Sequence, residues 1–317
     1  MRNRILEFSH AAVRLSIRYG QLVIHRSEIP DSTIPMSDVA VIIAAQPQMS
    51  YSQAVLGSLL ENGGVFVVCS PQRMPVGMLL PLGGNGTQSA YFRQQVNLSL
   101  PRQKQLWKSV VQAKIAMQAM LLVKETGTDF GLTRLISTVR SGDSSNVEAT
   151  AAVRYWKSLF GAEFRRDRGS EGVNGLLNYG YAVLRAMVAR AICAAGLHPT
   201  LGIHHCNQYN AWCLADDLME PYRPVVDRAV LQLVRAGDGQ VDVSGPGRQQ
   251  VLQALLGRVD VADQSWTVFD GVQRLAQSLR SVICGHPGEL IFPEGFVDER
   301  DGTADFGVQC HVADGDV

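Results

Sequence analysis

Residues 172–199 read GVNGLLNYGYAVLRAMVARAICAAGLHP, and this stretch decides how the chain is divided. It predicts one long and largely apolar helix that ends at Gly196. Residues 101–125 predict a second long helix, since apolar residues recur there at steps of three and four. Further helices are predicted over 144–161, 209–220, 225–235, 247–257 and 267–283. We therefore expect residues 91–290 to form an all-helical domain.

The first 80 residues follow a different period. Residues 12–26, AVRLSIRYGQLVIHR, alternate apolar and polar side chains on both sides of Tyr19-Gly20, which predicts a β-hairpin. Apolar runs at 39–45 and 64–70 predict buried strands, and the segment between them predicts a short helix. The expected fold is α+β: a β-rich, sandwich-like domain with one short helix over 1–80, a linker over 81–90, and the all-α domain.

The charges are distributed unevenly along a chain whose formal net charge is zero. Residues 91–230 hold 17 Lys and Arg against 11 Asp and Glu, whereas residues 294–317 hold one Arg against seven Asp and Glu. The basic middle suits either a DNA surface or an ordinary solvated face. Residues 291–317 are expected to be an acidic, disordered tail outside the catalytic domain.

Cysteine spacing and hydropathy indicate the compartment. The six cysteines form no CxxC pair, which fits a reducing cytosol. Arg14 and Arg18 interrupt the segment where a signal peptide would need apolar residues. No apolar run approaches the roughly 18 residues of a membrane span. We expect a soluble, cytoplasmic protein with no membrane partner.

Residues 202–224, GIHHCNQYNAWCLADDLMEPYRP, contain the candidate metal ligands. Asp217 and Glu220 are three residues apart, which places both carboxylates on one face of a helix. His205 precedes them by a short loop. A neutral imidazole with carboxylates makes a mixed nitrogen and oxygen site that suits Mg²⁺ or Mn²⁺.

Structural roles remain open for the same residues. Asp216 or Asp217 can pair with Arg223 or Arg228, and a single histidine before a helix is often a capping or core residue. Glu148 lies in the first turn of its predicted helix, where the helix dipole stabilises a carboxylate without any function. Basic residues on the 101–125 helix can simply face water.

Three ordered motifs in the second domain narrow these alternatives. They are N-x-x-L-N-Y-G-Y-A-x-L-R-A from position 174, G-L-x-P-x-L-G-I-H-H from 196, and D-L-M-E-P-Y-R-P-x-V-D from 217. Together they resemble the CRISPR-associated family-one proteins, the nucleases and integrases that insert spacer DNA into a CRISPR array. The paired histidines and the DLMEPYRP form are most similar to versions from type II systems.

The resemblance implies roles for individual residues. Glu148, His205 and Glu220 match the family's metal ligands, and Asp217 matches the accompanying acidic position in the catalytic set. Many relatives carry Asp where Glu220 stands. The implied metal is Mg²⁺ or Mn²⁺.

The resemblance also implies partners: double-stranded prespacer and repeat DNA, a small second CRISPR-associated protein, and a second copy of the chain. We expect the two copies to pair through the β-rich domain, since a small sheet with free edges invites pairing. Phosphate contacts are expected from six basic residues: Arg102, Lys104, Lys108, Arg165, Arg166 and Arg168. Two alternatives stay open: a related integrase of a mobile element outside CRISPR, and a DNA-binding scaffold with a vestigial metal site.

Overall fold

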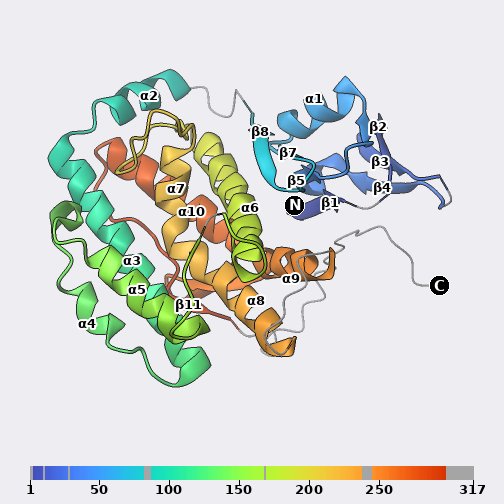
Figure 1. Ribbon diagram of the computed structural model, residues 1–317. Coiled ribbons are helices and arrows are strands. Elements are labelled where there is room, and N and C mark those ends of the chain that lie inside the picture. The colour runs from blue at the N-terminus through green and yellow to red at the C-terminus, as the bar shows by residue number, and fades with distance from the viewer. Residues whose placement is uncertain are drawn as a thin grey trace.

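The computed structural model describes residues 3–9, 11–27, 29–81, 87–167, 169–237 and 245–297. Figure 1 shows a strand-rich N-terminal part, in blue, beside a larger and mostly helical part, in green to red. This arrangement confirms the predicted α+β fold class.

Two four-stranded sheets share a core in the strand-rich part, as a sandwich-like domain requires. The first sheet runs in the order β1 (Arg4–Phe8), β5 (Val39–Ala44), β7 (Val65–Cys69) and β8 (Pro75–Leu79). The second runs in the order β4 (Ser32–Pro35), β3 (Gln21–His25), β2 (Arg14–Arg18) and β6 (Ser50–Tyr51). The short helices α1 (Gln53–Glu61) and η1 (Met36–Asp38) complete this part.

The hairpin predicted at Tyr19-Gly20 joins β2 and β3. Both turn residues have positive φ, 51° for Tyr19 and 72° for Gly20. Positive φ at both central residues is the pattern of the two-residue turn that matches strand twist.

Strand β5 lies between two apolar cores. Ile42 packs in the core between the two sheets, together with Phe66 of β7. Val41 and Ile43 point the other way and belong to the core of the helical part. Because β5 is buried on both faces, its sequence VAVIIA shows no polar alternation. The two parts of the molecule are therefore joined by a continuous apolar layer as well as by the chain itself.

The helical part is built around α6 (Val173–Ala194), which packs against α7, α8, α9 and α10. The other helices are α2 (Gln88–Val96), α3 (Leu100–Thr126), α4 (Leu132–Ile136), η2 (Ser141–Asp143), α5 (Val147–Phe160), α7 (Cys213–Met219), η3 (Glu220–Tyr222), α8 (Arg223–Ala236), α9 (Gly245–Leu256) and α10 (Val268–Ile283). Gly180 lets this packing occur, because a Cβ there would lie 2.4 Å from Val226 of α8 and 2.8 Å from Val251 of α9.

A three-stranded sheet corrects the expectation of an all-helical second domain. Its order is β10 (Gln264–Thr267), β9 (Arg258–Val261) and β11 (Gly295–Phe296). The turn between β9 and β10 is made by Ala262 and Asp263, both with positive φ. Neither is the glycine that usually marks such a turn, and the strands are short, so the sequence gives little signal.

The predicted boundaries shift in two places. α2 begins at Gln88, inside the predicted linker, and residues 82–86 lie outside the described residues. β11 falls inside the predicted tail and pairs with β9; the tail's residues 298–317 lie outside the described residues. Within the described ranges, every helix is too short or too polar to cross a lipid bilayer.

Candidate metal and DNA site

A lysine lies between the two glutamates assigned to metal binding. Lys114 Nζ is 2.6 Å from Glu148 Oε1 and 2.6 Å from Glu220 Oε2. The other oxygen of Glu220, Oε1, is 2.9 Å from an Arg223 guanidinium nitrogen. Lys114 comes from the middle of α3, Glu148 from the start of α5, and Glu220 from the start of η3. The fold thus brings Glu148 and Glu220 together.

Asp143 fixes the start of α5 and with it Glu148. Its two carboxylate oxygens accept hydrogen bonds from the amides of Val147 and Glu148, each at 2.9 Å. These are amide groups that the first turn of a helix leaves without an intrahelical partner. The sequence placed the helix start at 144, so this capping role of Asp143 was not predicted.

Asp217 holds the loop that carries His205. Its side chain is fully buried and accepts hydrogen bonds from the amides of Ile203, His204 and His205, at 2.6, 3.0 and 3.3 Å. It also lies 2.6 Å from His205 Nδ1. A carboxylate on Nδ1 fixes the ring and leaves Nε2 for a ligand, as in many metal sites. In this structure Asp217 supports His205 and has no oxygen to spare.

Gly202 is required by the same loop. A Cβ at this position would lie 2.2 Å from the His205 carbonyl oxygen and 3.1 Å from Asp217 Oδ2. Any other residue would push the loop away from Asp217. The glycine of the G-I-H-H motif is therefore explained by the close approach of backbone and carboxylate.

His204 stacks on Trp107 of α3, with ring centroids 4.2 Å apart and planes 4° from parallel. The His205 ring meets the edge or face of Trp107 at nearly a right angle, with centroids 5.7 Å apart. Trp107 is buried and was not singled out from the sequence. It anchors the histidine pair to α3, the helix that also carries Lys114.

Electrostatics keep the cluster charged. Burial alone would raise the pKa of Glu220, but Arg223 and Lys114 hold it at about 2. Burial would lower the pKa of Lys114, but Glu220 and Glu148 raise it. The hydrogen bond that His205 Nδ1 donates to the Asp217 carboxylate raises the pKa of His205, with a further contribution from the Glu220 carboxylate.

The donor chemistry fits a hard divalent cation. Glu148 and Glu220 offer carboxylate oxygens, and His205 offers an imidazole nitrogen backed by a carboxylate. Glu220 Oε2 is enclosed and makes no well-directed hydrogen bond, although Lys114 lies 2.6 Å away as an ion-pair partner. Among the described residues, no three His, Cys, Asp or Glu side chains converge on one point as the structure stands. Lys114 takes the space between two of them.

The predicted DNA-binding residues divide into two groups. Arg102, Lys104 and Arg165 are exposed, and Lys108 is partly exposed. Arg166 instead binds within the fold, donating to Asn174 Oδ1 at 2.9 Å and to Asn178 Oδ1 at 2.6 Å; Arg168 lies outside the described residues.

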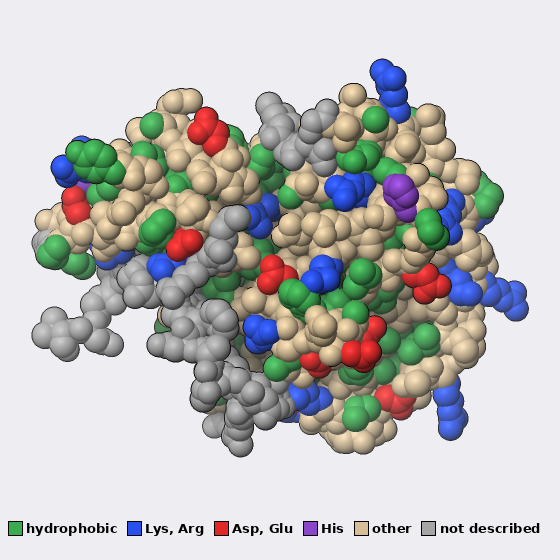
Figure 2. All heavy atoms as spheres, turned by 180° about the vertical axis from the view of Figure 1, so that it is seen from behind, with side chains coloured by type: hydrophobic (Ala, Val, Ile, Leu, Met, Phe, Trp, Pro, Cys, Tyr) green, Lys and Arg blue, Asp and Glu red, His purple; other side chains and the backbone are tan. Residues whose placement is uncertain are grey.

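The surface view does not show a purely basic face. In Figure 2, Lys and Arg side chains project from the outer edge of the helical part, interspersed with Asp and Glu. Exposed basic residues are therefore available to phosphates, without a continuous basic patch on this side.

Asp216 has a structural partner. It accepts from Arg185 at 2.6 Å and from Asn210 at 2.7 Å. The carboxylate does pair with an arginine, but that arginine is Arg185 of α6 and neither of the two partners considered from the sequence. Arg223 pairs with Glu220 instead, and Arg228 lies 3.5 Å from Glu125.

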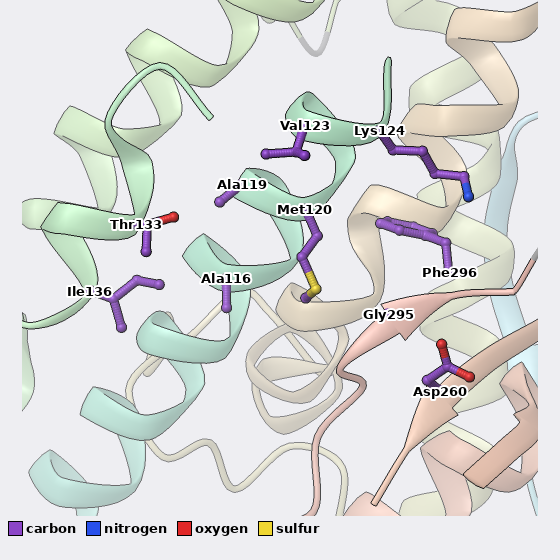
Figure 3. Close-up of a pocket in the computed structure, with 10 residues that line it drawn as sticks. All are labelled: Ala116, Ala119, Met120, Val123, Lys124, Thr133, Ile136, Asp260, Gly295 and Phe296. Carbon is purple, nitrogen blue, oxygen red and sulfur yellow. The ribbon is translucent and has the colours of Figure 1, made fainter. Parts of the chain in front are cut away.

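An apolar cavity of about 490 Å³ lies between α3, α4 and β11 (Figure 3). Its lining includes Ala119, Met120, Ile136 and Phe296, and none of the candidate site residues. The chemistry described above therefore does not depend on this cavity.

Comparison with known proteins places the chain in a family. The family model described as "CRISPR associated protein Cas1" matches residues 8–244. The CRISPR-associated endonuclease Cas1 of Neisseria meningitidis serogroup C (strain 8013) is 35% identical over 271 residues, covering 84% of this chain and 88% of the relative.

Solved structures share the fold. A casposase bound to its integration product has a TM-score of 0.76 at 17% identity and covers 92% of both chains. A chain of a Cas6-RT-Cas1–Cas2 complex has a TM-score of 0.70 at 17% identity, over 90% of this chain and 35% of that one. The family model spans well over half of the sequence, and the Neisseria relative is similar over most of both lengths. The chain therefore belongs to the Cas1 family of CRISPR-associated endonucleases.

Proposed function

We propose that this chain is a metal-dependent DNA integrase and endonuclease that inserts spacer DNA into a CRISPR array. The observation that supports it most is the pairing of Glu148 and Glu220 around Lys114, with His205 held beside them by Asp217. Two carboxylates in contact with cations, one buried and one partly exposed, lie next to an oriented imidazole and form a site that can accept a positively charged ligand and an anionic substrate.

The proposed ligands are Glu148, Glu220 and His205, and the proposed ion is Mg²⁺ or Mn²⁺. Such an ion, when bound, polarises a phosphodiester and lowers the pKa of an attacking hydroxyl or water. Asp217 keeps His205 oriented with Nε2 available. Arg223 keeps Glu220 ionised, because its guanidinium disfavours protonation of that carboxylate.

The proposed reaction is a transesterification. A 3′-hydroxyl of the spacer attacks a phosphorus at the repeat border, a new P–O bond forms, and the bond to the leaving 3′-oxygen breaks. The number of phosphodiester bonds is unchanged, so no energy-supplying cofactor is needed. Attack by water at the same site gives hydrolysis and accounts for an endonuclease activity.

Phosphate contacts would come from the exposed basic residues Arg102, Lys104 and Arg165, with Lys108 beside them. Such contacts hold DNA with little sequence preference and weaken as salt rises. The proposed protein partners are the small second CRISPR-associated protein and a second copy of this chain, paired through the strand-rich part.

An integration assay tests the function. Purified protein is incubated with a short duplex and a supercoiled plasmid that carries a repeat, with and without Mn²⁺ and the small partner protein. We expect joined products only with the metal, more of them with the partner, and most of them at the repeat. A plasmid that lacks the repeat is the matched control.

The same assay separates the alternatives. Equal joining into both plasmids would favour a mobile-element integrase outside CRISPR; the casposase likeness does not decide this, because it concerns the fold alone. DNA binding without any joining or cleavage would favour a scaffold with a vestigial site.

A further inference from the structure

Lys114 occupies the position that the proposed metal ion would need. Its Nζ is within 2.6 Å of an oxygen from each of the two glutamates, and its side chain is only 12% exposed. These ion pairs do not form on an open surface. Lys114 projects from the middle of α3, in the mostly apolar stretch AKIAMQAMLL. A buried lysine is costly unless its charge is paired.

The charges in this cluster already balance. Glu148 and Glu220 carry two negative charges, and Lys114 and Arg223 carry two positive charges at contact distance. A divalent ion that enters while both basic residues remain adds positive charge to a partly buried site, which is unfavourable. Metal binding in this state therefore competes with the ammonium group for the same carboxylate oxygens.

A phosphodiester changes that balance. It brings a negative charge and oxygen acceptors, which give the ammonium group a new partner once it leaves the carboxylates. Lysine suits such a transfer because its ammonium is a compact point charge on a flexible stem. Arg223 is less suited, since its guanidinium also lies over the ring of Tyr181, 4.5 Å from the centroid.

We propose that Lys114 makes metal binding conditional on DNA: without DNA its ammonium holds Glu148 and Glu220 together and opposes the metal, and with DNA it moves to the phosphate and releases both carboxylates. This inference rests on the proposed function. If Lys114 acts in this way, the protein binds metal weakly until DNA is present. The site without its DNA substrate then does not catalyse hydrolysis.

Thermodynamic linkage makes the coupling between DNA binding and metal binding measurable as a change in affinity. If DNA strengthens Mn²⁺ binding, Mn²⁺ strengthens DNA binding by the same factor. Coupling between sites of this kind is typically about 5- to 150-fold. A variant without the ammonium group has lost the competitor, so its Mn²⁺ affinity without DNA rises and the DNA effect shrinks.

The test is a Mn²⁺ titration followed by electron paramagnetic resonance of the free ion. It uses the full chain, alone and with a short duplex whose strands lack a 3′-hydroxyl, so that no joining occurs. The variants are Lys114→Met, which keeps most of the stem, and Lys114→Gln, which keeps a hydrogen-bond donor without the charge. Lys157→Met is the control, because Lys157 is an exposed lysine on α5 outside the site.

For the wild type and Lys157→Met we expect weak Mn²⁺ binding that DNA strengthens at least about fivefold. For both Lys114 variants we expect tighter binding without DNA and little further effect of DNA. In thermal unfolding, the Lys114 variants should melt lower than wild type without metal and gain more from added Mn²⁺, since the paired carboxylates then regain a cation.

Two failures are distinguishable. If the wild type binds Mn²⁺ but the Lys114 variants bind it no more tightly and keep the same DNA effect, the role of Lys114 is wrong and the metal site stands. If the wild type binds no Mn²⁺ with or without DNA, the metal site itself is wrong, and this inference falls with it.

Discussion

Two buried polar clusters in the helical part have opposite designs. Around Lys114, carboxylates meet cations and the group is partly open, with the Glu148 side chain 25% exposed. Around Asp227, a carboxylate that is 1% exposed accepts hydrogen bonds from Tyr155, at 2.7 Å, and from Tyr181. Arg223 touches both clusters, pairing with Glu220 and covering the ring of Tyr181.

The difference in exposure and charge between the two clusters separates a candidate catalytic site from a structural one. The Asp227 cluster is enclosed and neutral donors satisfy its carboxylate, so it suits a fixed connection between α5, α6 and α8. The Lys114 cluster pairs its carboxylates with charged side chains, is partly open, and lies beside an oriented imidazole. We therefore propose a catalytic role for the Lys114 cluster and a structural role for the Asp227 cluster, and the following variants test that division.

The largest effect should come from Glu220→Ala. Loss of this carboxylate should reduce metal-dependent joining by about 10³-fold or more, because a catalytic metal contributes several kcal/mol. DNA affinity should stay within about threefold of wild type, since phosphate contacts come from elsewhere. The measurement is a joining assay with a parallel binding titration, and Glu163→Ala, an exposed glutamate on a loop, is the control. Normal joining by Glu220→Ala would remove Glu220 from the site.

Asp217→Ala should lower stability and metal affinity together. The change leaves the amides of 203–205 without their acceptor, and we expect a loss of about 3 kcal/mol in the free energy of unfolding. Losing the carboxylate behind a ligand histidine typically costs about 10- to 100-fold in metal affinity. Urea unfolding and Mn²⁺ titration measure the two effects. A variant as stable as wild type would show that Asp217 does not hold the loop.

Asp227 should give stability a characteristic pH dependence. Burial raises its pKa to about 6, although Tyr181 and Tyr155 oppose this, against 3.8 for an ordinary aspartate. The pKa of Asp227 is higher in the folded than in the unfolded state, so protonation of Asp227 stabilises the fold. This contribution to the free energy of unfolding is fully present below about pH 4 and is lost as pH rises through 6.

The comparison for this prediction is Asp227→Asn, which cannot titrate. Between pH 4 and 6.5, wild-type stability should fall relative to the variant by up to about 3 kcal/mol, the equivalent of the pKa difference. Thermal or urea unfolding across this range measures it. Parallel curves for the two proteins would contradict the raised pKa.

The smallest effects should separate Arg165 from Arg166. Arg165→Ala removes an exposed charge and should reduce the salt dependence of DNA binding by about one counterion, with little change in stability. Arg166→Ala breaks hydrogen bonds to Asn174 and Asn178, so we expect a loss of about 1–3 kcal/mol in stability and a smaller effect on DNA. Unchanged stability of Arg166→Ala together with a clear loss of DNA binding would show that Arg166 contacts DNA.

Strong local patterns made most of the fold predictable. The alternation around Tyr19-Gly20 and the apolar runs of β5 and β7 gave the strands, and long periodic segments gave α3, α5 and α6. The sheet β9–β10–β11 was missed because its strands are short and Ala262-Asp263 makes its turn without glycine.

Part of the candidate site could not be predicted from sequence patterns. The motifs pointed to Glu148, His205 and Glu220, since these lie in recognisable patterns. Lys114 and Trp107 act through contacts with residues far along the chain, which no local spacing encodes. Asp143 makes local contacts, four and five residues ahead, and was missed because the predicted helix start lay at Ser144. The one available signal was a single charge in the apolar middle of a helix, AKIAMQAMLL, which is typical of a buried and paired lysine.

Anomalous diffraction from crystals of this chain, grown with Mn²⁺ and a duplex that cannot react, tests the metal ligands and the movement of Lys114 together. We expect one manganese peak in contact with Glu148, Glu220 and His205 Nε2, with the Lys114 ammonium moved onto a phosphate. A peak elsewhere, or Mn²⁺ absent from these three side chains while DNA is bound, would contradict this expectation.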